Sequence, residues 1–256
     1  TDLALERISR MNINLIAVDE AHCISQWGYD FRPPYLEIAR LRDLFPDVPM
    51  LAVTATATKV VVKDIQEKLE FKAPNIFVKS FKRDNLAYVV LEEEGKLEKL
   101  LEIVTKVKGT GIVYVRNRRK TKEAAYFLQQ KGLAADFYHA GLEPETRSKK
   151  QDLWIQNKIR IMVCTNAFGM GIDKPDVRTV VHLELPDSLE GYFQEAGRAG
   201  RDGKKAYAVL LYNESDKKRL EKNFETAFPD FEEIGTVYRE LGSYFQLATG
   251  GGPAQS

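Results

Sequence analysis

Short apolar runs alternate with amphipathic stretches along most of this 256-residue chain. The runs favour strands that are buried in a sheet, and the stretches between them repeat apolar residues at helical spacing. Strands that alternate with helices indicate an α/β fold with parallel sheets. The expected strands span 15–18, 50–53, 76–78, 86–91, 111–115, 134–138, 159–164, 179–183 and 206–211, and the expected helices include 96–107, 121–131, 143–156 and 188–197.

The pattern changes at two places. Residues 80–85 are polar and rich in turn-forming residues, so we expect a domain boundary there. After Tyr212 the alternation stops, and two helices are expected over 214–227 and 231–246 before a glycine-rich, flexible end.

Composition narrows the class of protein only slightly. A net charge of +1 gives no global sign of a polyanionic partner, so any nucleic-acid surface must be local. The two cysteines, Cys23 and Cys164, cannot form a disulfide framework or a four-cysteine zinc site, so a reducing, cytoplasmic location and no bound zinc are expected. The sequence has no apolar stretch long enough for a membrane span, so no membrane partner is expected.

The first candidate site follows residues 15–18, an apolar run that ends in Asp19 and Glu20. Ligands bind at the carboxyl ends of the strands in open α/β sheets. A nucleotide-bound Mg²⁺ and an attacking water require one carboxylate as a metal ligand and another as a proton acceptor. An acidic, solvated turn would look the same in isolation.

The next loop, residues 23–35, is rich in aromatic residues. Trp27, Phe31 and Arg32 are suited to stacking on unpaired bases, although Tyr35 could equally belong to the core. A second strand end, around Thr54 and Thr56, carries hydroxyls that could relay hydrogen bonds between ligands. An N-cap before a helix near Val60 explains those hydroxyls as well.

Residues 187–203 give a second strong signal. Asp187 and Glu190 suggest a capping box, and Gln194, Arg198 and Arg201 would then share one helical face. Glycines among these residues suggest that another surface approaches this helix closely. The guanidinium groups of the helix could then bind phosphates.

Three weaker signals also follow expected strands. The segment 165–173 contains a Gly-x-Gly suited to anion binding, which includes Gly171. His139 follows another strand, and the basic run 116–122 could bind a phosphate backbone or simply begin a helix.

Taken in order, these segments resemble the motifs of superfamily 2 helicases, and specifically the RecQ family of DNA helicases. Residues 19–22 (Asp-Glu-Ala-His) resemble motif II, 25–32 the aromatic-rich loop, 54–56 motif III, 169–173 motif V and 194–201 motif VI. The resemblance covers about residues 1–213. It implies ATP and Mg²⁺ as cofactors and single-stranded and partially duplex DNA as partners.

The resemblance also implies a role for each matched residue. Asp19 would bind Mg²⁺, Glu20 would activate the attacking water, and Arg198 and Arg201 would reach the phosphates, with Arg201 as the arginine finger. The residues implied to couple the nucleotide to DNA are His22, Gln26, Thr54, Thr56, Gly171, Asp173 and Gln194. Those implied to contact DNA are Trp27, Phe31, Arg32, Arg116, Asn117, His139 and Thr165.

The implied fold is α/β, with RecA-like parallel sheets flanked by helices. One partial lobe would span 1–82, one complete lobe 83–213, and a helical extension with a flexible tail 214–256. The chain contains no Gly-x-x-x-x-Gly-Lys-[Ser/Thr], so we expect it to begin inside the first lobe and to be inactive alone. The leading hypothesis is the motor of an ATP-dependent DNA helicase, and the alternative is a non-catalytic module that binds DNA or a partner protein.

Overall fold

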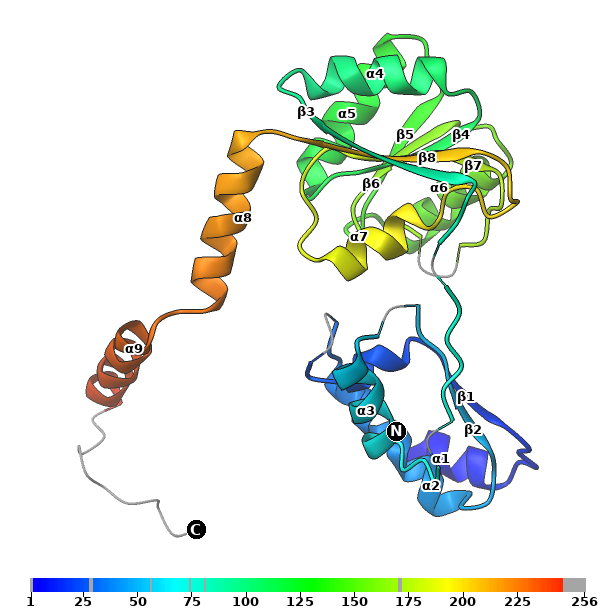
Figure 1. Cartoon of the computed structure of the whole chain (residues 1–256), viewed down its shortest axis with the longest axis vertical. Coiled ribbons are helices and arrows are strands. Elements are labelled where there is room, and N and C mark those ends of the chain that lie inside the picture. Colours follow the sequence, from blue (N-terminus) through cyan, green and yellow to red (C-terminus); the bar gives the residue numbers. More distant parts are fainter. Residues whose placement is uncertain are drawn as a thin grey trace.

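The computed structural model describes residues 2–27, 30–55, 57–73, 75–80, 82–169 and 172–245, with residues 2–4 as backbone only. Figure 1 shows two α/β bodies joined by an extended segment, with two helices that project from the second body. Among the described residues, no helix is both long and apolar enough to cross a bilayer.

The first body is built on a two-stranded parallel sheet. Strand β1 (Ile16–Val18) pairs with β2 (Met50–Ala52), and Ile16 lies opposite Met50. Helix α3 (Lys59–Lys68) packs its buried Val61 and Ile65 against β1. The other elements are α1 (Asp2–Ser9), the 3-10 turns Ala21–Ile24 and Pro33–Ala39, and α2 (Arg40–Leu44).

The second body has a six-stranded sheet in the order β3-β8-β7-β4-β6-β5, and every neighbouring pair is parallel. This confirms the predicted α/β class with parallel sheets. The strands are β3 (Leu86–Glu92), β4 (Thr110–Tyr114), β5 (Ala135–Tyr138), β6 (Ile161–Cys164), β7 (Val177–His182) and β8 (Ala206–Tyr212).

Helices cover both faces of this sheet, which is why every residue of β4 and β6 is buried. One face packs against α4 (Lys96–Lys106) and α5 (Arg118–Gln130) through a cluster that includes Leu100 and Leu128. The other face packs against α6 (Pro144–Ile155) and α7 (Leu189–Ala196), with the buried Trp154 and Ala196 in its core.

The extension consists of α8 (Glu214–Ala227) and α9 (Phe231–Tyr244). Asn213 and Asp216 form a capping box at the start of α8. The Asp216 carboxylate is buried and pairs with the Lys96 ammonium of α4, which anchors this end of α8 on the second body. No residue of α9 is buried.

The strand expected over 76–78 is wrong. Residues 75–80 have no regular secondary structure, and Phe77 and Val78 are exposed. An apolar run becomes a strand only where a neighbouring strand supplies hydrogen bonds and a face to pack on, and this connecting segment has neither.

Candidate functional site

The acidic pair lies at the carboxyl end of β1, as the sequence predicts. Glu20 adopts a left-handed conformation (φ 50°), which turns the chain sharply after the strand. The Asp19 side chain is exposed, and its Oδ1 accepts a hydrogen bond from the Glu20 amide at 2.8 Å. Two carboxylates therefore lie at this sheet edge, where hard oxygen ligands could hold Mg²⁺.

His22 connects this turn to the second strand end. It is buried, and its Nδ1 lies 2.9 Å from Thr54 Oγ1 and 3.4 Å from Glu20 Oε2. Burial lowers the pKa of His22, so the ring favours its neutral form at pH 7. The structure thus brings two of the predicted nucleotide-coupling residues, His22 and Thr54, together with the predicted catalytic Glu20. The exposed Gln26 lies outside this cluster.

A hydrogen bond joins the two bodies at this site. The Gln194 Nε2, from α7 of the second body, donates to Glu20 Oε1 of the first body at 3.0 Å. These residues are 174 positions apart in the chain. The acidic turn and the segment 187–203 therefore face each other, as two halves of one site would.

The single helical face predicted for Gln194, Arg198 and Arg201 is wrong. Helix α7 ends at Ala196, and Gly200 has a positive φ of 64°. The carbonyls of Gly197 and Gly200 accept hydrogen bonds from Arg83 instead of continuing the helix. The two arginines consequently lie in the turns after α7.

The predicted capping box of Asp187 and Glu190 is also wrong. Ser188 is the N-cap of α7, and its hydroxyl accepts a hydrogen bond from the Gly191 amide at 3.0 Å. Asp187 pairs with the Arg116 guanidinium, because the end of β4 lies beside this loop. Ser188, one residue after Asp187, serves equally well as the N-cap of α7.

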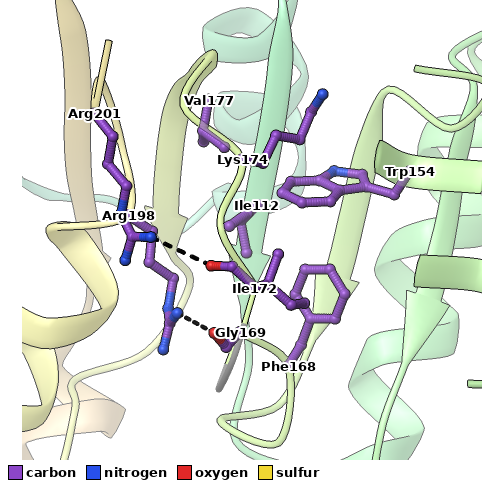
Figure 2. Close-up of a pocket in the computed structure, with 9 residues that line it drawn as sticks. All are labelled: Ile112, Trp154, Phe168, Gly169, Ile172, Lys174, Val177, Arg198 and Arg201. Atoms are coloured by element: carbon purple, nitrogen blue, oxygen red, sulfur yellow. Dashed lines mark hydrogen bonds between the residues drawn. The ribbon is translucent and has the colours of Figure 1, made fainter. Parts of the chain in front are cut away.

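The two arginines have different surroundings (Figure 2). Arg198 is buried, and its guanidinium donates to the Gly169 carbonyl, while its Nε has no hydrogen-bond partner within the described part of the chain. Arg201 is more exposed, pairs with Asp173 at 2.9 Å and donates to the Ile172 carbonyl at 3.3 Å. Arg201 is therefore the better placed of the two to move toward a ligand.

A cavity of about 10 Å³ separates Arg198 from the aromatic core, which is room for about one water molecule. Trp154 and Phe168 form its apolar wall, and Gly169 lies at φ 118° beside the guanidinium. A Cβ at Gly169 would lie 2.6 Å from Arg198 Nε, so any larger residue would displace the arginine. The cavity is far too small for a nucleotide and belongs to the packing of Arg198.

The aromatic loop combines exposed and anchored residues. Trp27 is 74% exposed, Phe31 is half-buried, and Tyr35 packs against the core of the first body. Arg32 pairs with Asp30 at 2.5 Å. The exposed indole is available for stacking, whereas Tyr35 belongs to the core, which was the other possibility considered for it.

The predicted DNA-contact residues of the second body lie on the loops that follow β4, β5 and β6. Arg116 donates to the Leu185 carbonyl, and Asn117 caps α5 by accepting from the Lys120 amide. Thr165 is half-buried directly after β6. His139 is buried, and neither of its ring nitrogens has a hydrogen-bond partner among the described residues.

Three cations lie near His139: Arg118 and Lys122 belong to the basic run considered above, whereas Lys150 was missed from the sequence. The Arg118 guanidinium lies against Gly141, Lys122 lies 5.4 Å from the Phe137 ring centroid, and Lys150 lies 4.0 Å from the same centroid. Burial lowers the pKa of His139, and these cations lower it further. Lys150 comes from α6, so only the tertiary fold places it beside α5; the basic run itself was the available signal for Arg118 and Lys122.

Thr56 and Gly171, two further candidates, lie outside the described residues. Their predicted roles stay predictions, as do the roles of the other site residues.

Comparisons with known proteins point to helicases. Residues 95–203 match the helicase conserved C-terminal domain. The chain is 41% identical over 241 residues to the probable ATP-dependent DNA helicase RecS of Bacillus subtilis, covering 93% of this chain and 49% of that protein. It is 44% identical over 216 residues to the ATP-dependent DNA helicase RecQ of Pasteurella multocida, covering 84% and 34%. The chain belongs to the RecQ family of helicases.

The chain spans only about a third to a half of the length of those two bacterial relatives. Solved structures support the RecA-like fold at lower identity. Dbp5 of S. cerevisiae bound to RNA and ADP BeF3 is 20% identical, with a TM-score of 0.65 over 93% of this chain and 66% of that one. The helicase Lhr of Mycobacterium smegmatis bound to ssDNA and AMP-PNP is 23% identical, with a TM-score of 0.64 over 79% and 29%.

Proposed function

We propose that this chain is the greater part of the motor of an ATP-dependent DNA helicase, which couples ATP hydrolysis to movement along single-stranded DNA and to duplex unwinding. The hydrogen bond between Gln194 and Glu20 carries the proposal. It joins the second body, which contains the helicase C-terminal domain, to the acidic turn of the first body. The names of the RecQ relatives support ATP and DNA as ligands.

In this proposal the acidic turn performs the chemistry. The exposed Asp19 carboxylate would hold Mg²⁺, which neutralises charge on the phosphates when it is bound. Glu20 would orient the attacking water and accept its proton. Gln194 donates to Oε1 of Glu20 here, which leaves Oε2, 3.4 Å from His22 Nδ1, to accept from the water.

DNA would be sensed at the aromatic loop. Trp27 offers an exposed indole for base stacking, and the buried His22 lies between this loop and Glu20. When a base stacks on Trp27 and moves the loop, the contacts of Cys23 and His22 would transmit that movement to the Glu20 carboxylate. Cations around Phe137 would hold the phosphate backbone on the second body.

The test joins this chain to a preceding segment that carries Gly-x-x-x-x-Gly-Lys-[Ser/Thr]. We expect the joined polypeptide to hydrolyse ATP with stimulation by single-stranded DNA, and the chain alone to be inactive, because only the joined form can hold the phosphates. A colorimetric phosphate assay measures turnover, and a joined Glu20→Gln variant serves as the silent control. Absence of hydrolysis under saturating DNA, with DNA binding retained, would favour the non-catalytic alternative.

Replacing Trp27 with alanine tests the sensor role. We expect basal ATP hydrolysis in the joined polypeptide to persist while its stimulation by DNA falls, since the exposed indole supports no core packing. Loss of one stacked base costs about 1–3 kcal/mol of DNA binding, which is roughly 5- to 150-fold. Leu189→Ala, at another exposed apolar residue, is the control, and an equal loss of basal and stimulated turnover in the Trp27 variant would reject the role.

A further inference from the structure

The side chains of His22, Cys23 and Asp30 form a cluster in the first body. One ligand atom from each residue lies within 4.8 Å of the other two. The Cys23 Sγ lies 3.7 Å from His22 Nε2 and 3.8 Å from Asp30 Oδ2. From the geometry of these three groups we propose that the cluster is a binding site for a thiophilic divalent cation of the Zn²⁺ class.

The distances fit a tetrahedral metal centre. With Zn–S about 2.3 Å and Zn–N or Zn–O about 2.0–2.2 Å, tetrahedral angles place sulfur about 3.6 Å from each of the other ligand atoms. The two separations from Cys23 Sγ in this structure are within about 0.2 Å of that value. The ligand atoms of His22 and Asp30 lie within 4.8 Å of each other, and Asp30 is a partly exposed residue that can move toward an ion.

The ligand set is that of an open site. An imidazole nitrogen, a thiolate and a carboxylate supply three positions, and water would complete the fourth. The other His22 nitrogen, Nδ1, faces Thr54 Oγ1 and Glu20 Oε2, which orients the ring so that Nε2 points to Cys23. The expectation of no zinc considered only a four-cysteine site, which this cluster is not.

Two groups oppose binding and limit its strength. Burial, with the neighbouring Asp30 carboxylate, raises the pKa of Cys23 to about 11, so the incoming metal must release the thiol proton to solvent. The Arg32 guanidinium pairs with Asp30 at 2.5 Å and must give up that carboxylate. An ion bound here would therefore join the turn after motif II to the aromatic loop and leave Arg32 without this partner.

The site is tested with Co²⁺ and Zn²⁺ on the purified 256-residue chain. We expect Co²⁺ to produce a thiolate-to-metal charge-transfer band and the visible absorption of tetrahedral cobalt, and Zn²⁺ to displace it at one ion per chain. Turnover is not the readout, because His22 also belongs to the proposed nucleotide site.

Matched variants separate the ligands from other cysteines. Cys164→Ser removes the second buried thiol and is expected to leave the band unchanged. Cys23→Ser is expected to abolish the band, and Asp30→Asn to weaken Co²⁺ affinity by about tenfold or more. Asp30 is partly exposed, so that variant keeps the test valid if Cys23→Ser fails to fold. Absence of the band in the unmodified chain, or its persistence in Cys23→Ser, would overturn the proposal.

Discussion

Replacing Arg201 with alanine is expected to lower ATP turnover of the joined polypeptide by about 10³-fold or more, the range of arginine-finger contributions. Arg201 is the more exposed guanidinium of the pair and is held by Asp173 at the edge of the second body. An ion pair at a partly exposed position is weak, so nucleotide phosphates can compete for this arginine. Turnover under saturating ATP and DNA measures the effect.

Two further variants distinguish a catalytic loss from a general one. Arg201→Lys keeps the charge but not the bidentate geometry, so it should restore only a small part of the turnover. Arg239→Ala removes an arginine that donates to Gly235 and Thr236 of its own helix, α9, and it should leave turnover unchanged. A loss of less than about tenfold in the Arg201→Ala variant would show that this residue does not stabilise the transition state.

Replacing Trp154 with alanine is expected to lower the free energy of unfolding of the second body by about 3–5 kcal/mol. The indole is fully buried, packs edge-on against Phe168 at 5.2 Å between centroids, and donates from Nε1 to the Gly111 carbonyl at 3.3 Å. Truncation would leave a cavity, remove one hydrogen bond to that carbonyl and remove the ring beneath the Lys174 ammonium. Urea unfolding followed by far-ultraviolet circular dichroism measures the loss.

Leu189→Ala is the matched control for this measurement, because Leu189 is a large apolar residue that is 81% exposed. Its effect should stay within about 0.5 kcal/mol, as for most surface substitutions. If Trp154→Ala costs less than about 1 kcal/mol, the aromatic packing around Arg198 does not support the second body in the way described here.

The sequence predicted the strands of the second body well because their environment leaves a simple signature. Strands covered by helices on both faces are rich in apolar residues, so the largely apolar runs 111–115 and 159–164 could be recognised as strands without knowing their neighbours. An apolar run also predicted a strand over residues 76–78, and that prediction is wrong. There the apolar residues lie in the connecting segment, and no local feature separates an unpaired run from a paired one.

The residue types of the candidate site were also visible in the sequence alone. Adjacent carboxylates at a strand end, the aromatic loop and two arginines near position 200 are present as residue types in a fixed order. Only the tertiary structure decided how they are held. Helix α7 stops at Ala196 because distant partners bind the backbone that follows it: the Gly200 amide donates to the Val177 carbonyl, and Asn85 donates to the Gly200 carbonyl. Helical periodicity carries no information about hydrogen bonds across more than 100 residues, so it could not show that Arg198 is buried and Arg201 exposed.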